Sequence, residues 1–189
     1  MRIIKVLIKL YFILIIILTL AGCKKNNENE IDKPKQSTED SASETLTTLE
    51  LIPVTSDELF TIITQTNSKA VILNIWATWC QPCREEFPDL LQVYDKYKDQ
   101  GLNLLLVSAD FQSNKAEAME FLSSQGVTFQ SYLKNENDQK FIDALHPSWS
   151  GALPATFTFD SEGKLINFHE GKTSKEKFEQ MVREALSYN

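Results

Sequence analysis

The sequence is poor in the residues that several common kinds of site require. It contains only two histidines, His146 and His169, and three cysteines, Cys23, Cys80 and Cys83. A four-ligand zinc site would need almost all of them, so we expect no metal site. The first 22 residues hold three of the 19 basic residues and no acidic one, which leaves 16 basic against 26 acidic residues. Because nucleic-acid binding depends on Lys and Arg that neutralise phosphates, we expect no nucleic-acid partner.

The first 23 residues are typical of a targeting segment. A basic start precedes an apolar run of 12 residues, Leu10 to Ala21, which is short for a spanning helix of about 20 residues. The tetrad Leu20-Ala21-Gly22-Cys23 resembles the bacterial lipobox, which implies cleavage before Cys23 and lipid on its sulfur. The alternative is an uncleaved anchor helix. Both interpretations predict an extracytoplasmic protein held at a bacterial membrane, where disulfides can persist.

Composition divides the chain into a signal peptide (1–22), a flexible tether (23–51) and a folded domain (52–189). The tether is rich in Lys, Glu, Asn, Ser and Thr and has almost no apolar residue before Leu46. Such a segment cannot bury enough surface to offset the entropy lost on ordering. The remaining 138 residues are enough for one substantial core.

Apolar patterning in this domain alternates between the strand and the helix period. We expect a first helix capped at Ser56-Asp57-Glu58, and then strands over 70–76, 102–108, 130–133, 155–159 and 165–170, with helices over 80–99, 115–125, 138–145 and 174–186. Asp160-Ser161-Glu162-Gly163 is a hairpin signal. Strands that alternate with helices and end in a hairpin predict an α/β domain, with one central mixed sheet covered by helices on both faces.

Cys80 and Cys83 lie three residues apart where a strand gives way to a helix. The first thiol would lie at the positive end of the helix, where free backbone N–H groups favour a thiolate. Cys80 is therefore the candidate nucleophile for a client disulfide, and Cys83, one turn further on, would resolve the mixed disulfide. This exchange needs no cofactor. Pro82 suits the first turn of a helix, where its missing N–H costs nothing.

Three other interpretations of the two cysteines compete with this one: half of a zinc site, a structural disulfide and chance spacing. No second CxxC or pair of histidines completes a zinc site. A structural disulfide around so small a loop would constrain the unfolded chain little. Trp79 and Pro82 beside the cysteines argue against chance spacing.

The segment VILNIWATWCQPCREEFPDL, residues 71–90, resembles the active-site segment of the thioredoxin superfamily, in particular its TlpA-like (ResA/DsbE-type), membrane-anchored branch. The resemblance extends over about residues 55–187 and implies the thioredoxin fold, with residues 111–149 as the central insertion of that branch. The positions that follow the family pattern are Trp76, Ala77, Trp79, Cys80, Pro82, Cys83 and Pro88.

Downstream, residues 151–157 (GALPATF) resemble the loop that carries the cis-proline of the family. The resemblance implies that Pro154 faces the disulfide and that Leu153 presents its backbone to an extended client segment. The predicted substrate groove consists of Trp79, Gln81, Pro82, Leu153 and Pro154. Trp149 could line this groove or pack in the core, and Trp79 could equally belong to the core.

One position departs from the thioredoxin pattern. Thioredoxins carry a buried Asp, which assists proton transfer at the resolving thiol, where this chain has Asn74. The TlpA-like branch commonly has a Glu three residues after the second cysteine, and Glu86 occupies that position. Helical spacing puts Glu86 on the same side of the helix as Cys83. We therefore expect Glu86 to assist proton transfer at the Cys83 thiol. The alternative is a solvated carboxylate like that of Glu85.

The residues and the resemblance together predict a lipid-anchored oxidoreductase that reduces disulfides in client proteins. The resemblance suggests cytochrome c maturation as one pathway and a membrane reductant of the DsbD type as the source of electrons. Two alternatives remain open. The first is a thiol peroxidase, because peroxiredoxins share the fold, although no Pro-x-x-x-Thr run precedes Cys80 here. The second is a non-catalytic binding module in which the CxxC disulfide only stabilises the helix.

Overall fold

Two apolar segments form the centre of the sheet in the computed structural model, which describes residues 49–188. β2 (Ala70–Trp76) is buried at all of its 7 positions, and β3 (Leu102–Ser108) pairs with it in parallel, with Ala70 opposite Leu102. Strands covered on both faces are continuous apolar runs, which is why the sequence predicts these two strands within a residue. Gly101, at a φ of 100°, adopts the left-handed conformation that leads into β3.

The sheet has the strand order β1-β4-β3-β2-β5-β6. β1 (Leu51–Val54) and β4 (Ser131–Lys134) extend its parallel part. β5 (Ala155–Asp160) pairs antiparallel with β2 and with β6 (Leu165–Glu170), which completes the opposite side. The predicted central mixed sheet and the predicted hairpin are confirmed.

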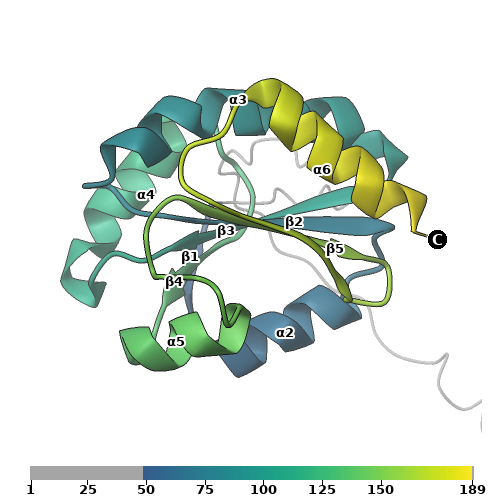
Figure 1. The fold of residues 1–189 in the computed structure, drawn as a ribbon. Coiled ribbons are helices and arrows are strands. Elements are labelled where there is room, and N and C mark those ends of the chain that lie inside the picture. Colours follow the sequence, from purple (N-terminus) through teal and green to yellow (C-terminus); the bar gives the residue numbers. More distant parts are fainter. Residues whose placement is uncertain (1–48, 189) are drawn as a thin grey trace, which may run out of the picture. The chain divides into compact units, whose positions relative to one another are not determined.

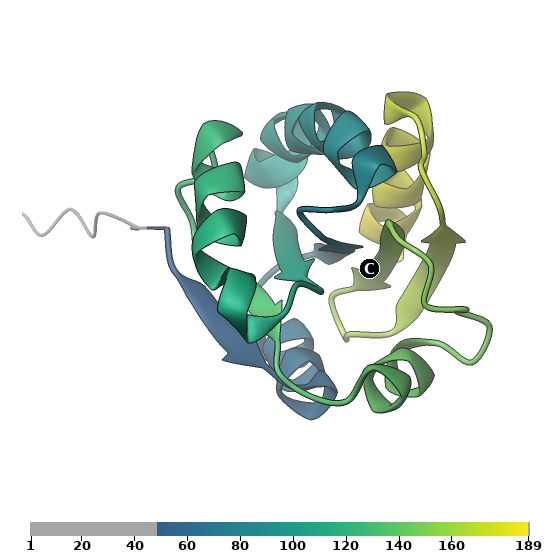
Figure 2. The ribbon, with the colours of Figure 1, turned by 90° about the vertical axis from the view of Figure 1, so that its left-hand side faces the viewer.

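Helices cover both faces of the sheet (Figures 1 and 2). On one face lie α3 (Gln81–Tyr97), α4 (Lys115–Ser124) and α6 (Lys175–Ser187), and on the other lie α2 (Ser56–Gln65) and α5 (Asp138–Leu145). Two short 3₁₀ helices span Lys98–Gln100 and Gln112–Asn114. Of the helices in residues 49–188, none has the length and apolarity that crossing a membrane requires.

β1 is the element that the sequence reading missed. Leu51, the last residue assigned to the tether, is the first residue of this strand and is fully buried, and Leu49 packs against the core. Pro53 interrupts the short apolar run and argues against a strand. In the structure β1 lies at the edge of the sheet, where a missing N–H is tolerated. The predicted signal peptide, Cys23 and most of the tether lie outside the described residues.

The first helix begins at a different cap from the expected one. Thr55, and not Ser56, is the N-cap of α2. The Glu58 backbone N–H donates to Thr55 Oγ1, and the Thr55 N–H donates to the Glu58 carboxylate at 2.8 Å. This reciprocal capping box satisfies two helix-end donors and leaves Ser56 buried inside the first turn.

Residues 111–149, predicted as an insertion, contribute α4, β4 and α5. β4 is inserted between β1 and β3, and Asn137 then caps α5 by accepting a hydrogen bond from the Lys140 N–H at 3.2 Å. α5 therefore lies on one face of the sheet, near the carboxyl ends of β2 and β3 (Figure 1). Three side chains of α5, those of Asp138, Phe141 and Ile142, consequently line the pocket of the candidate site.

Candidate active site

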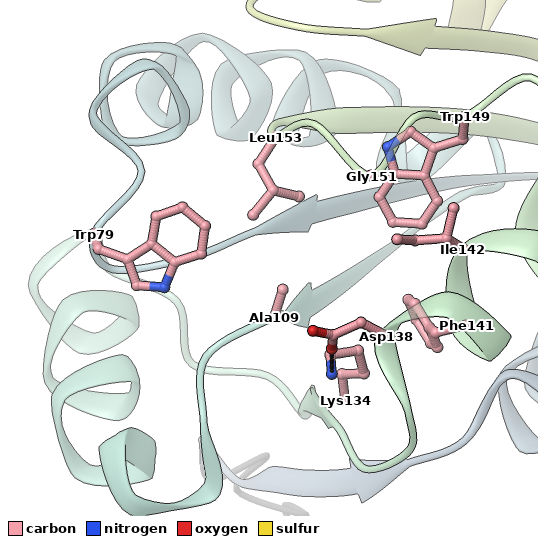
Figure 3. A pocket seen from close by; sticks show the side chains of 9 residues that line it. All are labelled: Trp79, Ala109, Lys134, Asp138, Phe141, Ile142, Trp149, Gly151 and Leu153. Atoms are coloured by element: carbon pink, nitrogen blue, oxygen red, sulfur yellow. Dashed lines mark hydrogen bonds and ion pairs between the residues drawn. The ribbon is translucent and has the colours of Figure 1, made fainter.

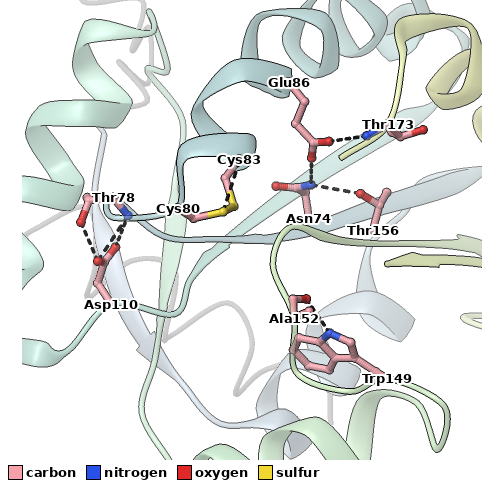
Figure 4. The surroundings of a disulfide bond; sticks show 10 residues. All are labelled: Asn74, Thr78, Cys80, Cys83, Glu86, Asp110, Trp149, Ala152, Thr156 and Thr173. Atoms are coloured by element: carbon pink, nitrogen blue, oxygen red, sulfur yellow. Dashed lines mark hydrogen bonds between the residues drawn. A yellow bond between two sulfur atoms is a disulfide. The ribbon is translucent and has the colours of Figure 1, made fainter. Parts of the chain in front are cut away.

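The two cysteines meet at the start of α3, just after the carboxyl end of β2. Cys80 is the N-cap of the helix and Cys83 lies in its first turn; their Cα atoms are 5.3 Å apart and their sulfurs form a disulfide (Figure 4). The Cys83 backbone N–H donates to Cys80 Sγ at 3.2 Å. After reduction the same N–H and the positive end of the helix would stabilise a Cys80 thiolate. Cys80 is 5% exposed and Cys83 is 1% exposed, so Cys80 is the sulfur that a client reaches first.

The segment before Cys80 is held in place by Asp110, which lies just beyond β3 (Figure 4). The Asp110 carboxylate accepts hydrogen bonds from the Thr78 N–H at 3.0 Å, from Thr78 Oγ1 at 2.6 Å and from Ser108 Oγ at 2.7 Å. Sequence reasoning missed this residue. The sequence signal that could have identified Asp110 is the pair of polar residues, Ser108 and Asp110, at the end of a buried strand. Polar side chains at the carboxyl ends of neighbouring parallel strands lie close together.

The loop before β5 contains the cis peptide bond between Leu153 and Pro154 that the resemblance implied. Two contacts with the end of β6 hold this loop. The Gly171 N–H donates to the Pro154 carbonyl at 2.7 Å, and Glu170 accepts hydrogen bonds from the Ser150 N–H and Oγ at 2.7 and 2.8 Å. Pro154 is buried, whereas Leu153 is half-buried and reaches the surface.

A pocket lies between Trp79 and the cis-proline loop (Figure 3). Its lining is mainly apolar, with an ion pair between Lys134 and Asp138 at one end. The lining residues are Trp79, Ala109, Lys134, Asp138, Phe141, Ile142, Trp149, Gly151 and Leu153. The sequence did not predict that Asp138, Phe141 and Ile142 of α5 line this pocket.

The structure separates the predicted groove residues into two groups. Trp79 is 67% exposed, so it is not a core residue, and it lines the pocket with Leu153. Trp149 is both buried and pocket-lining, and its indole N–H donates to the Ala152 carbonyl at 2.9 Å. Gln81, Pro82 and the buried Pro154 do not line the pocket. The Gln81 amide donates instead to exposed Glu85, which also pairs with Lys172 at 2.5 Å.

Glu86 is buried, with 1% of its surface exposed, so the alternative of a solvated carboxylate is wrong. Its Oε1 accepts a hydrogen bond from Asn74 Nδ2 at 3.1 Å, and its Oε2 accepts one from the Thr173 N–H at 2.8 Å. Asn74 also donates to Thr156 Oγ1 at 3.0 Å. Burial raises the pKa of Glu86 from its ordinary 4.5 to about 7, and the two hydrogen bonds to the carboxylate oppose that rise. A carboxyl group that titrates near neutrality is suited to proton transfer.

Other side-chain chemistry in the described part of the chain is sparse. Residues 49–188 contain no group of three or more His, Cys, Asp or Glu side chains that could hold a metal ion. His146 packs its ring on Phe168, with centroids 4.4 Å apart, and its Nδ1 accepts a hydrogen bond from the Ser148 N–H at 3.1 Å.

Comparison with known proteins connects this site to a family. The model of the AhpC/TSA family matches residues 47–168. The chain belongs to the AhpC/TSA family. The chain is also 36% identical to the thiol-disulfide oxidoreductase ResA of Bacillus subtilis (strain 168), over 54% of each chain. It is 32% identical to ResA of Bacillus thuringiensis (strain Al Hakam), over 59% of this chain and 60% of that protein. The chain thus spans little more than half the length of these curated relatives.

Solved structures of similar proteins confirm the predicted thioredoxin fold. The thiol:disulfide interchange protein of Chlorobium tepidum TLS superposes with a TM-score of 0.54 at 26% identity, covering 67% of this chain and 84% of that chain. A second Chlorobium tepidum structure, described as DsbE, has the same TM-score at 29% identity. StoA of Bacillus subtilis shares the fold, with a TM-score of 0.50 at 21% identity, over 62% of this chain and 85% of that one. This AhpC/TSA-family chain therefore has the thioredoxin fold and is similar to proteins of the ResA/DsbE type.

Proposed function

We propose that this AhpC/TSA-family protein is an extracytoplasmic thiol–disulfide oxidoreductase that reduces disulfides in client proteins. The observation that carries the proposal is the Cys80–Cys83 disulfide at the start of α3. Beside it lie the cis-proline loop and an apolar pocket open to a client segment. The activity named for the ResA relatives supports the same reaction.

The reaction transfers two electrons from the protein to the client. The Cys80 thiolate attacks one sulfur of the client disulfide, the client S–S bond breaks, and the released client thiolate takes up a proton. Cys83 then loses its proton, attacks the Cys80 sulfur and releases the second client thiolate, which leaves the Cys80–Cys83 disulfide. Because Cys83 is 1% exposed, its proton needs an acceptor inside the protein. We assign that role to Glu86, three residues further along the same helix.

A thiol peroxidase is the second candidate, because the family that matches the chain is AhpC/TSA. That chemistry would need a peroxidatic cysteine, and the strand before Cys80 contains no Pro-x-x-x-Thr run. The joined pair of cysteines and the names of the curated relatives favour disulfide exchange. Peroxide consumption by the reduced protein separates the two candidates.

The test uses the full chain in detergent with insulin as the client and a dithiol as the electron donor. We expect the wild type to accelerate insulin reduction and Cys80→Ser to abolish the acceleration. Cys83→Ala should accumulate a mixed disulfide that is absent from the double variant Cys80→Ser/Cys83→Ala. Turnover of hydrogen peroxide without reduction of insulin would replace this proposal with the peroxidase. Inactivity towards both, with full function of Cys80→Ser in cells, would leave a non-catalytic binding module.

We further infer that lipid on Cys23 holds the domain at a bacterial membrane, outside the cytoplasm, and that a DsbD-type membrane reductant restores its dithiol. The lipobox at the end of the short apolar run supports the anchor. Mass spectrometry of the N-terminal peptide should find acyl chains on Cys23, and an intact Met1 start in the membrane fraction would contradict this. Cytochrome c maturation is one pathway for such a reductase. Loss of cytochrome c in a deletion strain, restored by the wild type and not by Cys80→Ser, would support it.

A further inference from the structure

We propose that Asp110 is a positioning residue whose negative charge opposes the Cys80 thiolate and so keeps the Cys80–Cys83 couple reducing. The inference rests on the thiol–disulfide exchange proposed above. It starts from a buried carboxylate, 2% exposed, that anchors the segment leading to the nucleophile (Figure 4).

The contacts of Asp110 hold it firmly and leave its charge uncompensated. Both carboxylate oxygens accept hydrogen bonds from Thr78, and Oδ2 also accepts one from Ser108 Oγ. The Asp110 backbone N–H donates back to Ser108 Oγ at 3.0 Å. All of these partners are neutral, and within the described residues Asp110 forms no ion pair. Lys134, which lines a surface pocket together with Asp110, is paired with Asp138.

The carboxylate is close enough to Cys80 for its charge to act on the sulfur. Thr78 is two residues before Cys80, and the Cys80 N–H donates to the Ala77 carbonyl at 3.1 Å, which folds this segment into a tight turn. Chain geometry therefore puts the carboxylate on the order of 10 Å from the Cys80 sulfur. That separation is about one Debye length at ordinary salt, and both groups are buried, so solvent screens their interaction weakly.

The sign of the effect follows from the two charges. The Cys83 N–H and the helix N-terminus favour the thiolate, whereas the Asp110 carboxylate disfavours it. A less stable thiolate means a less stable reduced form, and hence a stronger reductant. Glu86 is the nearby group whose titration near pH 7 must be separated from this effect. The other charged residues around the site are Arg84, Glu85, Glu117, Glu120, Lys134, Glu136, Asp138 and Lys172.

The experiment compares Asp110→Asn with two controls that remove hydrogen bonds and keep the charge, Thr78→Val and Ser108→Ala. Each is made in the full chain, in wild-type and Glu86→Gln backgrounds. The pKa of the Cys80 thiol is measured from thiolate absorbance, and the redox equilibrium constant from glutathione buffers between about pH 6 and 9.5. For Asp110→Asn we expect a Cys80 pKa lower by about 0.5–1. The equilibrium should shift by about 3–10-fold towards the reduced protein, in both backgrounds and mainly above the pKa of the thiol.

A purely structural role predicts other results. Equal shifts in Asp110→Asn and Thr78→Val, a shift that does not vary with pH, or no shift at all would overturn the proposal. If Asp110→Asn fails to fold by circular dichroism, Asp110→Ser, which keeps an acceptor without the charge, must show the same shifts. Insulin reduction by the wild type is measured in parallel. A wild type that does not reduce insulin would refute the proposed function, whereas the thiol pKa and the glutathione equilibrium test Asp110 independently.

Discussion

Burial of the Glu86 carboxyl group makes the stability of this protein depend on pH in a direction opposite to the usual one for an acidic residue. Most carboxylates that are paired in the native state have lowered pKa values and stabilise a protein above pH 4. Glu86 has a raised pKa, about 7 against an ordinary 4.5, because it is buried. Between these two values the folded protein holds a proton that the unfolded chain releases, so the contribution of Glu86 to stability falls as the pH rises.

The magnitude follows from the two pKa values. One pKa unit is worth about 1.36 kcal/mol, so ionising Glu86 in the folded protein costs about 3 kcal/mol of unfolding free energy above pH 7. Below pH 4.5 this cost is absent. Glu86→Gln keeps the shape and one acceptor for the Thr173 N–H, but it cannot ionise. We therefore expect the stability of the variant, relative to the wild type, to rise by about 2–3 kcal/mol between pH 5 and 8.

The assay is urea unfolding of the oxidised protein at pH 5, 6, 7 and 8. Glu85→Gln is the matched control, because Glu85 is the exposed neighbour in the same turn of α3. The control should follow the wild type at every pH to within about 0.5 kcal/mol. Parallel stability profiles for the wild type and Glu86→Gln, or a variant that loses stability relative to the wild type as the pH rises, would refute the reasoning.

Three further predictions concern activity, potential and packing. Glu86→Gln should slow reduction of insulin by about 10-fold and abolish the rise in rate through pH 7, whereas Glu85→Gln should behave as the wild type in the same stopped-flow assay. The potential of the couple should lie nearer to about −270 mV than to about −120 mV, because Gln81-Pro82 provides no His to hold a thiolate; a value above about −180 mV in glutathione buffers would contradict this. Phe87→Ala should lower the unfolding free energy by about 3–5 kcal/mol, because the ring is fully buried and its centroid is 5.4 Å from that of Trp76. Alanine at Phe111, which is 77% exposed, should cost less than about 0.5 kcal/mol, and similar urea midpoints for the two variants would be incompatible with this packing.

Local sequence patterns were sufficient for most of the architecture and for the two thiols. β2 and β3 are continuous apolar runs, which buried parallel strands require, and the sequence predicts their bounds closely. Cys80 and Cys83 are three residues apart on one chain segment, so helix geometry alone brings them into reach. The cis bond before Pro154 followed from a resemblance in seven consecutive residues.

The tertiary structure decided which groups surround these thiols, because those contacts join residues that are far apart in the sequence. Glu86 meets Thr173, 87 residues away, and Thr78 meets Asp110, 32 residues away. Both contacts depend on strand register and helix packing, which no local pattern records. β1 is a strand only because β4 offers it a partner, since its Pro53 argues against a strand locally. The residues of this chain thus specify the two neighbouring cysteines locally, while the partners of the buried carboxylates Glu86 and Asp110 are set by packing over long sequence distances.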